Sequence, residues 1–185
     1  MIWYNKKMRQ KLFVEIGTCD FDTLEPLLQN GWTGYFIEPV KKYADKLPKE
    51  NTTNCCISSY DGEIDFYVSD DTGEEWIRGI SHCVSQQGTK LLELDGNREL
   101  LKETISVKCY KLQTFLKNNN IEYIDYLKVD TEGHETDIFD AYDWSVKPTF
   151  IKLEHFHIDD IKMRNLLEKQ GYMCYTEDRD IYAIR

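Results

Sequence analysis

Short apolar runs alternate with segments of helical spacing along most of the chain. Buried strands are predicted at 12–16 and at about 33–38, and each is followed by apolar residues at helical spacing, at 20–29 and 40–47. Strands that alternate with helices in this way predict an α/β fold whose sheet is mostly parallel.

The second half of the chain continues the pattern. Further strands are predicted at 54–59, 64–68, 105–110, 123–129 and 149–153. Helices are predicted at 112–117, 138–144 and 158–170, and the last residues, 172–175 and 181–184, predict an antiparallel hairpin. Residues 69–103 lack a long periodicity, so we expect a loop-rich insertion there, either a substrate lid or a disordered segment.

Composition narrows the class of protein. The 185 residues, 41% of them apolar, are enough for one well-packed domain, so we predict a single domain over 1–185. The net charge of −10 argues against nucleic acid or an anionic membrane surface as a partner. We expect a cytoplasmic protein without membrane insertion, because no apolar run resembles a signal peptide or reaches the ~20 residues of a membrane span. The six cysteines contain no Cys-x-x-Cys pair and are expected to be reduced.

Polar residues directly follow the predicted strands. They are Gly17, Glu38, Ser58, Asp130 and the pair Glu154-His155. Because ligands of parallel sheets bind beyond the carboxyl ends of the strands, where the strand order reverses, we expect these residues to meet at one site. A structural polar residue explains any one of them alone, but five in register are typical of a binding site.

Gly17 and Glu38 have the spacing of a nucleotide site. Gly17 ends a strand, where a missing Cβ allows a cofactor to approach the backbone closely. Glu38 follows 21 residues later, near the ~20-residue spacing at which an acid binds both ribose hydroxyls. The glycine pattern is incomplete, because Phe21 stands where a second glycine is expected. The alternative is a tight strand-to-helix turn with a surface glutamate.

Five segments share their pattern with a known family. They are Val14–Thr18, Phe36–Pro39, Ile57–Gly62, Leu127–Glu135 and Leu153-Glu154, and the most specific part is Lys-Val-Asp-Thr-Glu-Gly-His-Glu. Together they resemble the FkbM-type S-adenosylmethionine-dependent methyltransferases. The resemblance implies a Rossmann-like class I methyltransferase with a mostly parallel seven-stranded sheet, an antiparallel C-terminal hairpin and helices on both faces.

The resemblance also implies where S-adenosyl-L-methionine would bind. Glu15, Gly17 and Thr18 would border its amino-acid end, Glu38 would hold the ribose, and Ile57 with Ser58 would lie against the adenine. Asp20 and Pro39 complete the predicted cofactor-binding set. The position of Phe21 departs from the family pattern and leaves the path of the loop around the methionine portion open.

A hydroxyl acceptor needs a base or a metal ion to become a good nucleophile. His134 is the predicted base because the ordinary pKa of histidine lies near neutral pH; a histidine that caps or packs the start of a helix is the alternative. Asp130 and His155 complete the predicted catalytic set. A divalent cation such as magnesium, held by Asp130, Glu154 and His155, is the second option. His82 would reach the acceptor if the insertion is a lid.

The resemblance implies an O-methyltransferase that acts on a hydroxyl of a sugar, a glycan or a related small molecule, because members of this family commonly modify saccharides and polyketide hydroxyls. An N-methyltransferase is the nearest alternative, and it is distinguishable because an amine acceptor needs no metal. The alternative from another class is a methyltransferase-like module that binds the cofactor without turnover.

Overall fold

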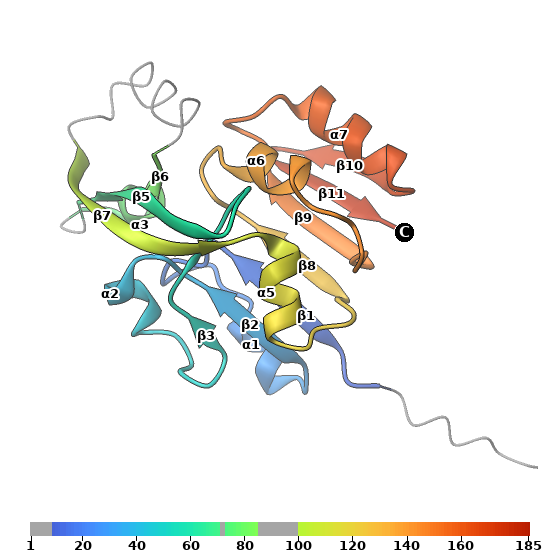
Figure 1. Cartoon of the computed structure of the whole chain (residues 1–185), viewed down its shortest axis with the longest axis horizontal. Coiled ribbons are helices and arrows are strands. Elements are labelled where there is room, and N and C mark those ends of the chain that lie inside the picture. The colour runs from blue at the N-terminus through green and yellow to red at the C-terminus, as the bar shows by residue number, and fades with distance from the viewer. Residues whose placement is uncertain (1–8, 71–72, 85–99) are drawn as a thin grey trace, which may run out of the picture.

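The main sheet has seven strands: β1 (Leu12–Ile16), β2 (Thr33–Ile37), β3 (Thr52–Thr53), β8 (Tyr126–Val129), β9 (Phe150–Glu154), β10 (Met173–Glu177) and β11 (Asp180–Ile184). The computed structural model describes residues 9–70, 73–84 and 100–185. The strand order is β10-β11-β9-β8-β1-β2-β3, with parallel pairing except at the C-terminal hairpin (Figure 1). The predicted α/β sheet and its antiparallel hairpin are therefore confirmed.

The strand order reverses between β1 and β8. From β1 the chain builds β2 and β3 on one side, and it returns to form β8 and β9 on the other side. Ligands of α/β sheets bind at this kind of switch point, beyond the carboxyl ends of the two strands. Gly17 follows β1 and Asp130 follows β8, so both residues lie at this point.

A second, four-stranded sheet was not expected. It consists of β4 (Cys56–Ile57), β5 (Gly62–Ser69), β6 (His82–Cys83) and β7 (Leu101–Tyr110) in the order β4-β7-β5-β6. The predicted strand at 54–59 is thus divided: Thr52–Thr53 pairs with β2 as β3, and Cys56–Ile57 pairs with β7. Figure 1 shows this sheet with α2 (Lys41–Ala44) and α3 (Glu75–Gly79) at one end of the molecule.

The predicted insertion at 69–103 is more ordered than its sequence indicates. Residues 73–84 contain α3 and β6, and β7 begins at Leu101 rather than at residue 105. Residues 71–72 and 85–99 lie outside the described residues, so the prediction of a lid or of disorder is not tested there.

Helices cover both faces of the main sheet. One face packs Val14 and Ile16 against α5 (Leu112–Asn118), α6 (Glu135–Asp140) and α7 (Asp160–Lys169). Phe13 points to the opposite face, because side chains alternate along a strand, and packs near α1 (Glu25–Gln29). In the part of the chain that the structure describes, no helix is long and apolar enough to span a membrane.

Candidate functional site

Gly17 closes the switch point. Its φ is +78°, and a Cβ there would lie 1.7 Å from the carbonyl oxygen of Asp130. The Gly17 N–H donates to the Ile37 carbonyl at 3.0 Å, and the Asp130 N–H donates to the Ile16 carbonyl at 3.0 Å. The missing Cβ therefore allows the chain after β1 to cross directly over the end of β8.

The loop after β1 is tight without a second glycine. Cys19 and Asp22 both have φ of +50°, a left-handed conformation that side chains adopt at a cost. The ring of Phe21 lies beside Gly79 of α3, and the Arg78 guanidinium carbon is 5.5 Å from the ring centroid. The loop thus packs against α3, which defines the path that the Phe21 position left open.

Glu38 is a buried carboxylate at the carboxyl end of β2. It is 4% exposed and accepts backbone hydrogen bonds from the N–H groups of Cys19 and Val40, each at 2.7 Å. Burial raises its pKa to about 7. Each carboxylate oxygen accepts one of these bonds and retains a lone pair, so the group can still accept two hydrogen bonds from a diol.

A cavity, which we call the first cavity, lies beside Glu38. Its wall includes Gly17, Glu38, Pro39, Ile57, Arg78 and Asp130. Four of these residues belong to the predicted cofactor-binding set, and Asp130 was predicted as a catalytic and metal-binding residue. Apart from Glu38, Arg78 and Asp130, the wall is largely apolar, as is usual for a ligand pocket.

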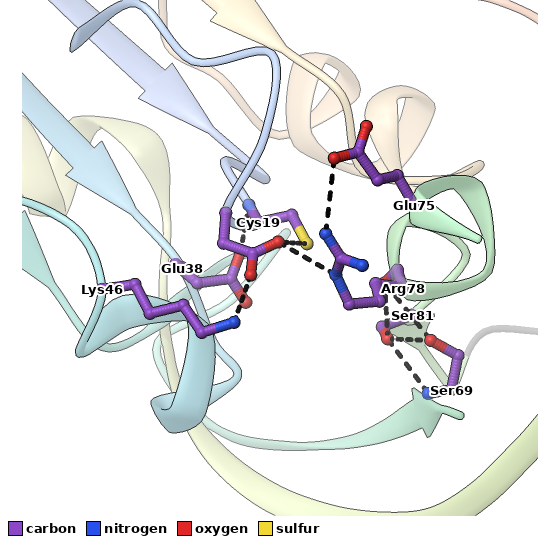
Figure 2. Close-up of polar contacts among 8 residues, drawn as sticks. Cys19, Glu38, Lys46, Ser69, Glu75, Arg78 and Ser81 are labelled. Atoms are coloured by element: carbon purple, nitrogen blue, oxygen red, sulfur yellow. Dashed lines mark hydrogen bonds and ion pairs between the residues drawn. The ribbon is translucent and has the colours of Figure 1, made fainter. Parts of the chain in front are cut away.

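Arg78 is the one positively charged residue among the described residues that line the first cavity. Its Nε donates to Asp20 Oδ1 at 3.1 Å, and Lys46 also pairs with the Asp20 carboxylate. Figure 2 shows the Arg78 side chain reaching from α3 toward Cys19 and Glu38. The predicted cofactor residue Asp20 therefore holds Arg78 in position. Arg78 was not among the predicted site residues, because it belongs to the irregular segment at 69–103.

A second, larger cavity adjoins the first. Gly17, Cys19, Gly79 and Asp130 line both cavities and form the wall between them. The second cavity is otherwise bordered by Phe21, Trp76 and Phe156, and by Glu132, Glu154 and His157. The two cavities suit two reactants that meet at a common wall.

Glu132, Glu154 and His157 form a cluster in the second cavity. One ligand atom from each lies within 4.8 Å of the others, and His157 Nε2 is 3.1 Å from Glu132 Oε2. Burial, and then the charges of Glu132 and Asp130, raise the pKa of Glu154 to about 9. Among the described residues, no group donates a hydrogen bond to the buried Glu154 Oε2.

The cluster differs from the predicted metal set of Asp130, Glu154 and His155. The structure brings Glu154 together with Glu132 and His157, whereas His155 lines neither cavity in the described part of the chain. The His155 N–H donates to the Arg179 carbonyl at 2.7 Å, which extends the pairing of β9 with β11. His157 lies two residues further along, in the turn after β9, where it reaches Glu132 across the neighbouring ends of β8 and β9.

The clustered acids carry a pH dependence. The ordinary pKa of glutamate applies to the unfolded chain, so between pH 4.5 and about 9 the folded protein holds a proton at Glu154 that the unfolded chain has released. This contribution to stability is complete below pH 4.5 and is lost as the pH rises toward 9. Glu154→Gln, which does not titrate, is expected to flatten the fall of the melting temperature between pH 6 and pH 9. Scanning calorimetry measures the melting temperature at each pH, with Glu168→Gln on the exposed side of α7 as the control. If the melting temperature falls equally steeply with pH in both variants, the raised pKa of Glu154 is contradicted.

Among the described residues that line the first cavity, neither Glu15 nor Thr18 is present. Glu15 is fully buried, pairs with Lys128 Nζ at 3.0 Å and accepts the Leu24 N–H at 2.8 Å. Thr18 lines the second cavity. The geometry gives Glu15 a structural role, because Lys128 and the Leu24 N–H already occupy its carboxylate.

Ser58 and His134 contact each other outside both cavities. The Ser58 hydroxyl lies 3.0 Å from His134 Nε2, and His134 Nδ1 lies 3.1 Å from Asp137 Oδ2. Although burial lowers the pKa of His134, the contacts with Asp137 and Cys83 raise it to about 10. A protonated histidine at the start of α6 fits the alternative of a packing residue better than the predicted base. His82 is 1% exposed and contacts Tyr67, so it also stays away from the cavities.

Comparisons with known proteins add a family to this geometry. The sequence profile of the Methyltransferase FkbM domain matches residues 15–174. No curated protein sequence matches the chain significantly. Among solved structures, the chain is similar to the precorrin-6y C5,15-methyltransferase from Geobacter metallireducens GS-15, with 14% sequence identity and a TM-score of 0.42 over 96% of this chain and 80% of that chain.

Proposed function

Because the chain belongs to the FkbM methyltransferase family, we propose that it transfers a methyl group from S-adenosylmethionine to a hydroxyl of a sugar, a glycan or a related small molecule. The observation that carries the proposal is Glu38, a buried acid that lines the first cavity at the end of β2 and accepts one backbone hydrogen bond at each oxygen. A carboxylate held in this way suits the two hydroxyls of a ribose.

The first cavity would hold the cofactor. With the ribose on Glu38, the adenine would lie against Ile57 and Pro39, and the sulfonium would lie at the wall shared by the cavities, near Asp130. Burial raises the pKa of Asp130 to about 7, and a positive sulfonium beside it favours the ionised form. The uncharged sulfur of the product lacks this attraction, which favours its release.

Arg78 would bind the carboxylate of the methionine portion. Its Nε is already held by Asp20, and Nη2 lies 3.9 Å from Glu75 Oε1, so the guanidinium group is oriented before a ligand binds. This role explains why an arginine of α3, the helix between β5 and β6 of the second sheet, reaches the loop after β1. It also assigns Asp20 to the cofactor site as a positioning residue.

Arg78→Leu is expected to weaken S-adenosylmethionine binding about tenfold or more, because a charge-assisted contact is lost. Binding of 5′-methylthioadenosine, which lacks the amino-acid portion, should change by less than about twofold on the same reasoning. Titration calorimetry measures both. Lys46→Leu is the matched control, since it removes the other cation on Asp20 without touching the cavity wall. If Arg78→Leu weakens the binding of both ligands equally, Arg78 does not bind the carboxylate of the methionine portion.

The second cavity would hold the acceptor. Trp76 and Phe156 are 48% and 50% exposed at its border, and such rings offer flat apolar faces on which a sugar can stack. His157 is the base that we propose, with Glu132 orienting its ring through the 3.1 Å contact. The base accepts the hydroxyl proton while the acceptor oxygen attacks the methyl group in line.

A divalent cation is the alternative use of the same cluster. Two carboxylates and an imidazole are suitable ligands for magnesium or manganese, and the buried Glu154 Oε2 lacks a hydrogen-bond donor among the described residues. The cation would be held by Glu132, Glu154 and His157, and it would supply a positive charge that makes the acceptor hydroxyl more acidic. EDTA distinguishes the two mechanisms, because removal of the cation abolishes methyl transfer only if the cluster acts through a bound metal ion.

Calorimetry on Glu38→Ala tests the proposal. The wild type is expected to bind S-adenosylmethionine and S-adenosylhomocysteine, and the substitution should weaken both by at least about tenfold, which corresponds to ~1.4 kcal/mol. Glu63→Ala, at an exposed position of β5, is the control. No heat with either ligand in the wild type would contradict a cofactor site in the first cavity.

Transfer of a labelled methyl group then distinguishes the remaining alternatives. Label on a saccharide hydroxyl supports O-methylation, and label on an amine acceptor supports the N-methyltransferase. Cofactor binding without transfer to any acceptor, with Glu38 intact, supports a module without turnover. Assays with magnesium and with EDTA separate the base from the cation.

A further inference from the structure

Two cysteines from opposite edges of the second sheet meet in the wall of the first cavity. Cys56 lies in β4 and Cys83 in β6, which are the two outermost strands of the order β4-β7-β5-β6. Their sulfur atoms are nevertheless 3.1 Å apart. The sheet therefore curves enough to bring its edges together, and both side chains face the cavity.

The surroundings of Cys83 favour its thiolate. The hydrogen bond with Cys56 and the neighbouring His134 lower the pKa of Cys83 to about 6, against the effect of burial. The hydrogen bond with Cys83 and burial raise the pKa of Cys56. A thiolate is the nucleophile in thiol oxidation, and a neighbouring thiol completes a disulfide, so the pair combines the two groups that the reaction needs.

Access to the pair leads through the first cavity. Cys56 is 4% exposed and Cys83 is 2% exposed, but both contribute to the cavity wall. Cys109 lies next to Cys56 across the β4–β7 pairing and is fully buried without lining the cavity. Cys19 and Cys55 also line the cavity, but burial raises the pKa of both thiols. A small oxidant that enters the cavity therefore finds the favoured thiolate at Cys83, and a ligand in the cavity blocks its way.

We propose that Cys56 and Cys83 are an oxidisable dithiol whose disulfide impairs ligand binding in the first cavity. The oxidant is a hydroperoxide. The Cys83 thiolate attacks one peroxide oxygen, the O–O bond breaks and the alkoxide or hydroxide leaves with a proton from solvent. The Cys56 thiol then attacks the sulfenic sulfur, the S–S bond forms, and water leaves. In total, two thiols are oxidised to one disulfide, and one hydroperoxide is reduced to one alcohol and one water. With hydrogen peroxide the products are the disulfide and two waters.

The disulfide would narrow the cavity. A sulfur–sulfur bond of about 2.05 Å requires the two atoms to approach by roughly 1 Å. Because β6 follows directly on Ser81, which lines the same cavity, this movement draws the wall at Ser81 and Cys83 toward Cys56. The effect on S-adenosylmethionine rests on the proposed function, whereas formation of the disulfide does not.

Hydrogen peroxide treatment of the reduced full-length protein tests the proposal. Mass spectrometry of peptides should find Cys56 linked to Cys83 in the wild type and in Cys174→Ser, a half-buried control on β10, but not in Cys83→Ser. Oxidation should weaken S-adenosylmethionine binding by at least about tenfold, and dithiothreitol should restore it. Saturating S-adenosylmethionine should slow formation of the link by a similar factor.

The outcomes separate the two proposals. Absence of the linked peptide, while all six thiols react with an alkylating reagent in urea, would overturn the dithiol. A linked peptide with unchanged ligand affinity would overturn its effect on the cavity. If the reduced protein does not bind S-adenosylmethionine, the proposed function fails, and the linked peptide alone then decides whether the dithiol exists.

Discussion

Replacing Gly17 with alanine is expected to destabilise the fold by more than about 3 kcal/mol and to abolish cofactor binding. The new Cβ would lie 1.7 Å from the Asp130 carbonyl oxygen, at a φ of +78° that already disfavours a side chain. Relief requires β1 and β8 to separate at their carboxyl ends, where Asp130 also lines both cavities. Urea denaturation followed by circular dichroism measures the loss of stability.

Gly31→Ala is the matched control for this substitution. Gly31 has nearly the same backbone conformation, with φ of +80°, but nothing lies within 4 Å of the position of its Cβ. It should cost only the left-handed penalty of about 1–2 kcal/mol. The difference between the variants isolates the steric contact with Asp130, and equal losses would mean that backbone conformation alone determines the effect.

Replacing Lys128 with methionine is the second substitution with a large expected effect, a loss of about 3–5 kcal/mol. Lys128 is 5% exposed and lies 3.0 Å from the fully buried Glu15. Without the ammonium group, Glu15 must either remain charged in an apolar environment or take up a proton. The reason for the loss is therefore the isolated acid and not the strength of the ion pair itself.

Two further variants test this reason. Adding Glu15→Gln to Lys128→Met should recover part of the stability, because the amide keeps an acceptor for the Leu24 N–H and carries no charge. Lys152 occupies the corresponding register position on β9 and pairs with Asp180, but its side chain is 24% exposed. Lys152→Met should cost less than about 1 kcal/mol. A double variant less stable than Lys128→Met would contradict the argument.

Local patterns were sufficient to predict the main sheet and the residues at its strand ends. Apolar runs fix β1, β2, β8 and β9, and a parallel sheet brings the residues after them to one edge. Gly17, Glu38 and Asp130 were therefore identified from the sequence, and the structure brings all three to the first cavity. Glu154 lies in the second cavity instead. Ser58 and His155 are the exceptions among the strand-end residues, because β4 belongs to the second sheet and His155 extends the pairing of β9 with β11.

Long-range contacts decide what the sequence did not reveal. Residues 20–24 have the acids of a helix start, but Glu15 binds the Leu24 N–H and Asp22 is left-handed, so α1 begins at Glu25. The first residues of β7 show no alternation because they are held by pairing with β5. Contacts of this kind depend on residues that are distant in the sequence, so no local sequence pattern predicts them.

The choice between histidines has the same origin. The sequence favours His134 because it lies in the most specific motif, yet Ser58 and Asp137 surround it in the fold. His157 has no distinctive neighbours in sequence, and only the pairing of β8 with β9 brings it to Glu132.

The segment 73–84 borders the first cavity as well as the second, through Arg78, Ser81 and Cys83. Under the proposed function this limits how the segment can evolve. A lid that touches only the acceptor is free to diverge as acceptors change, but this segment also contacts the cofactor, which stays the same. Descendants with new acceptors would therefore change Trp76 or Phe156 and retain Arg78, so substrate range and cofactor use are inherited through different residues, two of which share the helix α3.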